Sequence, residues 1–146
     1  MWRWLAACVI AVALTGCAQK AAFEELADGR CTSAQSELID GHISGQIAAL
    51  AKKDWPLAYS FASADFQARV GVDQFTLIIA AQYSMLIDNQ GYQFEKCEIA
   101  SDMIVQEVIV TTDEQVFNLT YRLSIKGSTL GVEAAIVNAA ETKLNI

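Results

Sequence analysis

The sequence predicts an α+β fold in which helices come first and an antiparallel sheet follows. Up to about Met85, apolar residues recur every three or four positions, which is the period of a helix. Beyond Asn89-Gln90-Gly91 the period becomes two, which indicates strands with one buried face. Helices followed by a run of strands with short turns are typical of the α+β class.

The N-terminal residues have the pattern of a bacterial lipoprotein signal peptide. Arg3 precedes an apolar run over 5–14, and Leu14-Thr15-Gly16-Cys17 follows the pattern that is cleaved before a cysteine. The run is too short to cross a bilayer, because a spanning helix needs about 20 apolar residues. We therefore expect a signal peptide over 1–16 and lipid on Cys17, which anchors the chain to the bacterial cell envelope. In a Gram-negative host we expect the outer membrane, facing the periplasm; an ordinary secretory signal is the alternative.

The charge of the chain argues against nucleic acid as a partner. Seventeen acidic residues stand against ten basic ones, a formal charge of −7, and removal of Arg3 with the signal makes it one unit more negative. An acidic body is repelled by nucleic acid and by anionic lipid, so the acyl chains supply the membrane affinity. The remaining length suits one domain, which we place at 32–146 after a flexible tether over 17–31.

Two of the four cysteines are left once Cys8 is lost with the signal and Cys17 carries lipid. Cys31 and Cys97 form an even pair in an oxidising compartment, which favours a disulfide; two independent cysteines are the alternative. Neither lies in a C-x-x-C motif, and one His beside two distant Cys makes a poor zinc site. We therefore expect no metal and no cofactor.

The first two helices have recognisable starts. Thr32 and Gln35 have the spacing of a capping box, and apolar residues at helical spacing continue from there to Leu50. A second helix is expected to begin at Asp54-Trp55-Pro56, because Pro costs little in a first helical turn. The second helix is expected to turn the following side chains inward: Leu57, Ala58 and Phe61.

The third and fourth helices are shorter and lead to the sheet. Ser63 can cap a helix over 64–70 that ends at Gly71, and Asp73 can cap a fourth helix that runs to about Met85. Strands are expected over 92–99, 103–111, 116–125 and 130–137, with turns at 112–114 and 126–128. The third of these strands presents alternate residues to one face: Phe117, Leu119, Tyr121, Leu123 and Ile125. Residues expected in the core are Leu38, Ile47, Leu50, Phe61, Phe75, Ile78, Leu119 and Leu123.

One set of residues along 42–137 resembles a known family. The set comprises Gln46-Ile-Ala-Ala-Leu, Asp54, the run 58–63, Phe66-Gln67, Gly71, Phe75 and Tyr83. It resembles an uncharacterised bacterial family within the nuclear transport factor 2-like (cystatin-like) superfamily. The resemblance implies a cone, in which a curved antiparallel sheet wraps around a long first helix and leaves a cavity or a shallow apolar face.

The same resemblance gives a place for a binding pocket, between the first three helices and the concave face of the sheet. The aromatic residues that would bound it are Tyr59, Phe66, Phe75, Phe117 and Tyr121. A pocket lined in this way takes a mostly apolar ligand. The alternative is that these aromatic side chains simply fill the interior, as closely packed protein cores require.

Catalytic members of the superfamily use an Asp/His or a Tyr/Asp pair deep in the cone, but the residues here do not single out such a pair. His42 is expected to be a solvent-facing helical histidine. Tyr83 and Tyr121 are oxyanion-donor candidates and Asp88 and Glu107 are base candidates, yet core tyrosines and surface acids explain them. Neither a serine nucleophile elbow nor a phosphate-binding glycine loop is present in the sequence. We therefore assign no catalytic residue.

These observations favour a non-enzymatic binding or scaffolding module, anchored to the membrane by lipid. Its partner would be another protein or a small apolar ligand, and an exposed apolar sheet face would favour the protein. The alternative is a cone-fold enzyme that acts on a small hydrophobic carbonyl compound or ester. A homodimer formed through the sheet and a monomer are both compatible with the sequence.

Overall fold

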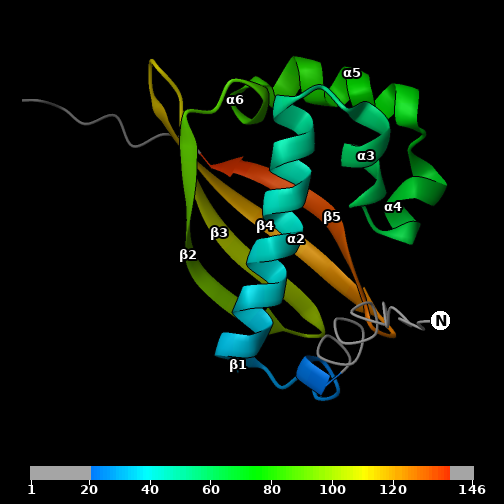
Figure 1. Ribbon diagram of the computed structural model, residues 1–146. Helices are drawn as coiled ribbons and strands as arrows, with labels where there is room; N and C mark the ends of the chain where they lie inside the picture. The colour runs from blue at the N-terminus through cyan, green and yellow to red at the C-terminus, as the bar shows by residue number, and fades with distance from the viewer. Residues whose placement is uncertain (1–20, 139–146) are drawn as a thin grey trace, which may run out of the picture.

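The computed structural model describes residues 21–138 and confirms the α+β class (Figure 1). The expected signal peptide over 1–16 and the lipidated Cys17 lie outside the described residues. Five strands form one antiparallel sheet in the order β1-β2-β3-β4-β5. The helices are α2 (Ser33–Ala51), α3 (Trp55–Ser60), α4 (Ala64–Arg69), α5 (Val72–Gln82) and α6 (Ser84–Ile87). The strands are β1 (Gly29–Arg30), β2 (Gly91–Ala100), β3 (Met103–Thr111), β4 (Val116–Lys126) and β5 (Thr129–Asn138).

Helix α2 lies across the sheet as the long central helix in Figure 1. Its start is the expected capping box: the Thr32 side chain accepts from the Gln35 backbone N–H, and the Gln35 side chain accepts from the Thr32 backbone N–H. The two bonds satisfy donors that a helix start otherwise leaves unpaired. Its buried apolar side chains, at helical spacing, are Ile39, Ile43, Ile47, Ala49 and Leu50.

The alternation expected in β4 is confirmed. Leu119, Tyr121 and Leu123 are all at most 1% exposed, while Asn118, just before them, and Arg122, within the run, are exposed. Strand β3 pairs with β4 in register, and its buried residues are Ile104, Gln106, Val108 and Val110. The face of the sheet that covers α2 is therefore the apolar one, and the opposite face is mixed in polarity.

The edge of the sheet along β5 is partly covered by the connection between α3 and α4. The Ser63 backbone N–H donates to the Val132 carbonyl, and the Val132 N–H donates to the Phe61 carbonyl. Gly131 permits this approach, because a Cβ there would lie 2.5 Å from the Ser63 Cα. Gly45 on α2 likewise makes room for the Phe61 ring, at 2.6 Å from an added Cβ.

Three expectations about the helices are wrong in detail. The expected single fourth helix is divided into α5 and α6, because the chain leaves helical geometry at Tyr83. Gly71 rather than Asp73 is the N-cap residue of α5, and Asp73 lies in its first turn. Leu57 is 49% exposed whereas Ala58 is buried. Consecutive helical residues point about 100° apart, so a helix of this length turns only one of the two toward α2.

The expected core is confirmed at most positions. Ile47, Leu50, Phe75, Leu119 and Leu123 are buried. The other three expected core residues are only half-buried: Leu38, Phe61 and Ile78.

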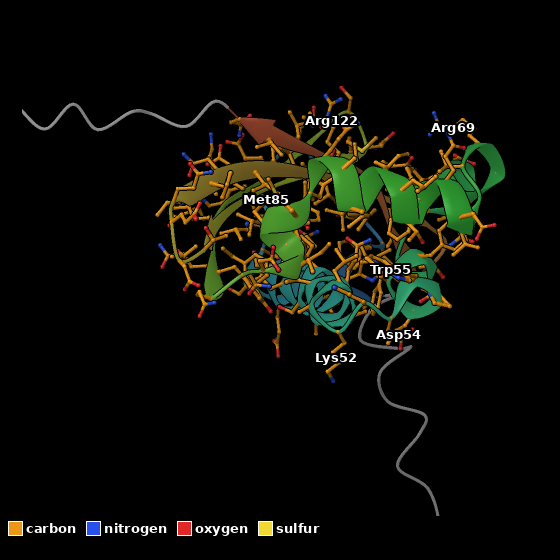
Figure 2. The ribbon with its side chains drawn as sticks, turned by 90° about the horizontal axis from the view of Figure 1, so that it is seen from above. Lys52, Asp54, Trp55, Arg69, Met85 and Arg122 are labelled. Atoms are coloured by element: carbon orange, nitrogen blue, oxygen red, sulfur yellow. A yellow bond between two sulfur atoms is a disulfide. The ribbon has the colours of Figure 1, made fainter. Side chains whose placement is uncertain are left out.

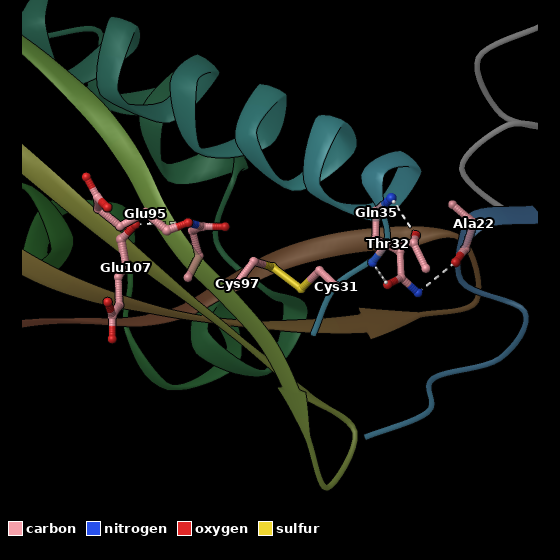
Figure 3. Close-up of a disulfide and its surroundings, with 8 residues drawn as sticks. Ala22, Cys31, Thr32, Gln35, Glu95, Cys97 and Glu107 are labelled. Carbon is pink, nitrogen blue, oxygen red and sulfur yellow. Dashed lines mark hydrogen bonds between the residues drawn. A yellow bond between two sulfur atoms is a disulfide. The ribbon is translucent and has the colours of Figure 1, made fainter. Parts of the chain in front are cut away.

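The segment before α2 packs against the domain instead of forming only a tether (Figure 3). Cys31 and Cys97 are joined by a disulfide, as the even pair of cysteines favoured. Strand β1 pairs with β2, Phe23 is buried, and the Gln35 side-chain amide donates to the Ala22 carbonyl at 3.0 Å. The flexible tether expected over 17–31 is therefore corrected for residues 21–31, which pack against the domain, while residues 17–20 lie outside the described residues.

Candidate functional site

A small pocket lies between α2, α5 and the inner face of β4 and β5. Its volume is about 160 Å³. In Figure 1, α5 lies across the C-terminal end of α2, and Figure 2, seen from above, shows α5 displaced from that end towards β5. We call it the α5–β5 pocket; it is lined by Gln46, Leu50, Ala62, Phe66, Phe75, Ile78, Ile79, Tyr83, Leu86, Tyr121, Val132, Glu133, Ala134 and Ala135.

Tyr121 is the most unusual residue of the α5–β5 pocket. It is fully buried on β4, yet its hydroxyl finds no hydrogen-bond partner within the described part of the chain. Burial raises the pKa of the Tyr121 phenol, and the neighbouring Tyr83 and Tyr92 add to the shift. The hydroxyl therefore stays protonated and keeps a proton to donate. A buried polar group without a partner is costly, by about 1–3 kcal/mol, so natural domains seldom keep one without a use.

Tyr83 closes one end of the α5–β5 pocket. It lies where α5 ends, and its hydroxyl donates to the Ala135 carbonyl on β5. Burial raises the pKa of the Tyr83 phenol, so this donor also stays protonated. The bond ties the end of α5 to the outer strand and fixes the width of the pocket.

Two further polar side chains line the α5–β5 pocket, and both are held by the protein. The buried Gln46 on α2 donates from Nε2 to the Ala58 carbonyl at 3.3 Å. Glu133 on β5 accepts from the Ser124 hydroxyl at 2.7 Å, and its other oxygen lies 3.8 Å from an Arg69 guanidinium nitrogen. The pocket is thus largely apolar, with a few fixed polar groups and one uncommitted hydroxyl.

The structure brings together three of the five aromatic residues expected at a pocket. Phe66, Phe75 and Tyr121 line the α5–β5 pocket. Tyr59 lies outside it, because its ring packs on Phe75 and its hydroxyl donates to the Val70 carbonyl at 2.8 Å. Phe117 also lies outside it, at the other end of β4, where it borders a polar groove formed with residues 84–90 and 112–115.

Two polar lining residues, Gln46 and Glu133, were not expected from the sequence, and Tyr83 was considered as an oxyanion donor but not as part of a pocket wall. Gln46 lies at helical spacing from the buried Ile39 and Ile43, so the sequence already indicated that its side chain lies on the buried face of the helix. Glu133 lies at an irregularity in the pairing of β4 with β5, which alternation does not predict. The role of Tyr83 depends on where α5 ends, and the sequence did not indicate that position.

The remaining catalytic candidates do not meet at the α5–β5 pocket. His42 is half-buried rather than solvent-facing: its Nε2 lies 2.9 Å from the Phe61 carbonyl and its ring packs edge-on against Phe61. Burial lowers the pKa of His42, and its bond to Phe61 opposes the shift. Asp88 and Glu107 are exposed surface acids, as expected, and neither lines the pocket with Tyr121.

Between residues 21 and 138, no group of three or more His, Cys, Asp or Glu side chains is placed to hold a metal ion. No helix in the same stretch is long and apolar enough to span a membrane.

A comparison with known protein families finds a match, which covers α2 to β5. A family model matches residues 32–142, from the capping residue of α2 past the end of β5. No curated protein and no solved structure matches the chain. The chain therefore belongs to the family that this model describes, Domain of unknown function (DUF4864).

Proposed function

We propose that this domain is a non-enzymatic binding module for a compact, mostly apolar molecule, which it holds in the α5–β5 pocket. The observation that carries the proposal is the buried Tyr121, which lines an apolar pocket and whose hydroxyl has no hydrogen-bond partner among the described residues. A ligand in the pocket would supply the missing hydrogen bond and fill the space. A protein partner on the surface would do neither, so this observation favours the small molecule.

The size of the pocket limits the ligand. Drug-sized ligands occupy pockets of about 300–1,000 Å³, whereas an apolar cavity of about 150 Å³ is known to hold benzene. At about 160 Å³, the α5–β5 pocket suits one ring or a short branched chain. Burying such a molecule contributes about 25 cal/mol per Å² of apolar surface removed from water.

Binding is favoured over turnover by the placement of the acids. The alternative, an enzyme acting on a carbonyl compound or ester, needs a carboxylate that is free to accept a proton beside the Tyr121 hydroxyl. Asp88 and Glu107 lie elsewhere, and the carboxylate of Glu133 is engaged by Ser124 and Arg69. The geometry of the described residues therefore supports a site that holds a molecule rather than one that transforms it.

We further propose that lipid on Cys17 holds the domain on the cell envelope. The support is the sequence pattern Leu14-Thr15-Gly16-Cys17 after a short apolar run. Two or three acyl chains bind a membrane firmly where one is marginal. We expect the mature chain isolated from its host to begin at an acylated Cys17, as peptide mass spectrometry can measure; a mature chain that begins elsewhere, without acyl groups, contradicts this.

The proposed fold family is the cone-like, nuclear transport factor 2-like group. The support is the order of elements, with helices first and a five-stranded antiparallel sheet after them, and the long α2 lying across that sheet (Figure 1). A pocket between the helices and the inner face of the sheet also agrees with such a cone.

The substitution Ala135→Leu tests the proposed function, because Ala135 lines the pocket and three added carbons would occupy much of it. We expect a compact aromatic probe such as ethylbenzene to raise the melting temperature of the wild-type full chain in detergent micelles, since binding to the folded state stabilises it. Ala135→Leu should abolish this rise while leaving the ligand-free chain folded, because the added side chain fills existing space.

Ala80→Leu is the matched control for the same experiment. It makes the same chemical change on an exposed position of α5 that does not line the pocket. It also reports any effect of probe that has partitioned into the micelles. A rise in melting temperature that is equal in all three chains would show that the probe binds outside the α5–β5 pocket, and would contradict the proposal.

A further inference from the structure

We infer that the ligand of the α5–β5 pocket is an uncharged molecule that carries a hydrogen-bond acceptor, such as a ketone, ester or ether oxygen, and that Tyr121 donates to it. This inference rests on the proposed function, because it names the class of molecule that the same pocket takes. It goes further by assigning a recognition contact and by excluding carboxylates.

The proton of the Tyr121 hydroxyl has no acceptor in the described protein. The side chain is fully buried, and within residues 21–138 no acceptor lies within hydrogen-bond reach of its oxygen. The phenol is held in its protonated form by burial. A ligand that offers an acceptor would therefore complete a hydrogen bond that the described protein leaves unmade.

Tyr121 differs from the other donors of the pocket, which already donate to backbone carbonyls. The Tyr83 proton is committed to the Ala135 carbonyl, and the Gln46 amide donates to the Ala58 carbonyl. These two donors fix the walls of the pocket. Of the described tyrosines that line the pocket, Tyr121 is the one whose hydroxyl proton is uncommitted, so it is the residue that selects the ligand.

The charges around the pocket disfavour a charged ligand. A buried carboxylate is strongly unfavourable unless a cation or several donors compensate it. The charged residue that lines the pocket is Glu133, and its guanidinium partner Arg69 does not line the pocket and is largely exposed. An anionic ligand would meet Glu133 without a free cation. A cationic ligand would find that carboxylate already engaged by Arg69 and Ser124, so an uncharged ligand fits best.

The test uses three probes of similar shape on the full chain in detergent micelles: acetophenone, ethylbenzene and benzoate. The variant is Tyr121→Phe, which removes only the hydroxyl oxygen. We expect Tyr121→Phe to weaken acetophenone binding about tenfold, which corresponds to one hydrogen bond of ordinary net strength, while ethylbenzene affinity changes by less than about twofold. Benzoate should bind the wild-type chain at least about tenfold more weakly than acetophenone, because of its charge.

Tyr83→Phe is the control variant. It removes a second hydroxyl from the same pocket, one whose proton is already committed, so we expect it to change the acetophenone and ethylbenzene affinities by the same factor. The ethylbenzene measurement also shows whether each variant keeps a folded pocket. A variant that misfolds would therefore lose ethylbenzene binding as well as acetophenone binding.

The outcomes separate the inference from the proposed function. If ethylbenzene binds and Tyr121→Phe weakens both uncharged probes equally, or neither, the pocket function stands and the hydrogen bond from Tyr121 is overturned. Benzoate binding tighter than acetophenone would overturn the exclusion of anions. If neither uncharged probe binds the wild-type chain, the proposed function fails together with the inference.

Discussion

Leu119→Asp is expected to abolish cooperative folding of the domain. Leu119 is 1% exposed on β4, paired with Val108 on one side and Val137 on the other. An isolated charge in such a place costs several kcal/mol even after the protein relaxes around it, in addition to the apolar contacts that are lost. Domains of this size are stable by only about 5–15 kcal/mol. Urea unfolding followed by circular dichroism should show no cooperative transition.

Asn118→Asp is the matched control for this change. Asn118 is the preceding residue of the same strand, and it is exposed on the opposite face of the sheet. The same side chain placed there should change the free energy of unfolding by less than about 1 kcal/mol. Two-state melting of Leu119→Asp near the wild-type temperature would contradict the core position of Leu119.

The double substitution Cys31→Ala with Cys97→Ala is expected to lower the free energy of unfolding by about 4 kcal/mol. The disulfide joins residues that are 66 positions apart, so it restricts a long loop of the unfolded chain. It also fixes β1 to β2, where the Cys31 backbone N–H donates to the Cys97 carbonyl at 3.1 Å. Urea unfolding of the oxidised wild type and the variant measures the difference.

Reductant provides the control for the disulfide prediction. Dithiothreitol should lower the stability of the wild-type chain to about that of the double variant and should leave the variant unchanged. A wild-type chain whose unfolding is the same with and without reductant would show that the bond is not formed in solution. That result would support the alternative of two independent cysteines.

The parts of the fold that the sequence predicted are those with strong local signals. The Thr32–Gln35 capping box located the start of α2, and the alternation of Leu119, Tyr121 and Leu123 identified the buried face of β4. Both signals depend on residues a few positions apart, and the physics that produces them is equally local.

The parts that were missed depend on contacts between distant residues. Strand β1 is two residues long and is held beside β2 by a disulfide and by strand pairing, which no local pattern indicates. The break between α5 and α6 occurs at Tyr83, whose hydroxyl bonds to Ala135, 52 positions away. Phe23 is buried although its segment is short, polar and charged. Tertiary contacts set these features.

The candidate site was predicted in part for the same reason. Alternation placed Tyr121 and Phe117 on the same face of β4, but residues on one face can border different cavities when they are well separated along the strand. Four strand residues span about 13 Å, and Phe117 borders a different groove. Tyr59 could not be assigned because its hydroxyl is held by Val70, a partner eleven positions away in the next helix's cap.

The central claim is that the α5–β5 pocket holds a compact apolar molecule, and native mass spectrometry of the protein isolated from its own cells tests it most directly. We predict that the wild-type chain and Ala80→Leu carry an added small-molecule mass and that Ala135→Leu does not. A bare wild-type chain, or the same mass at equal occupancy on Ala135→Leu, would contradict the claim.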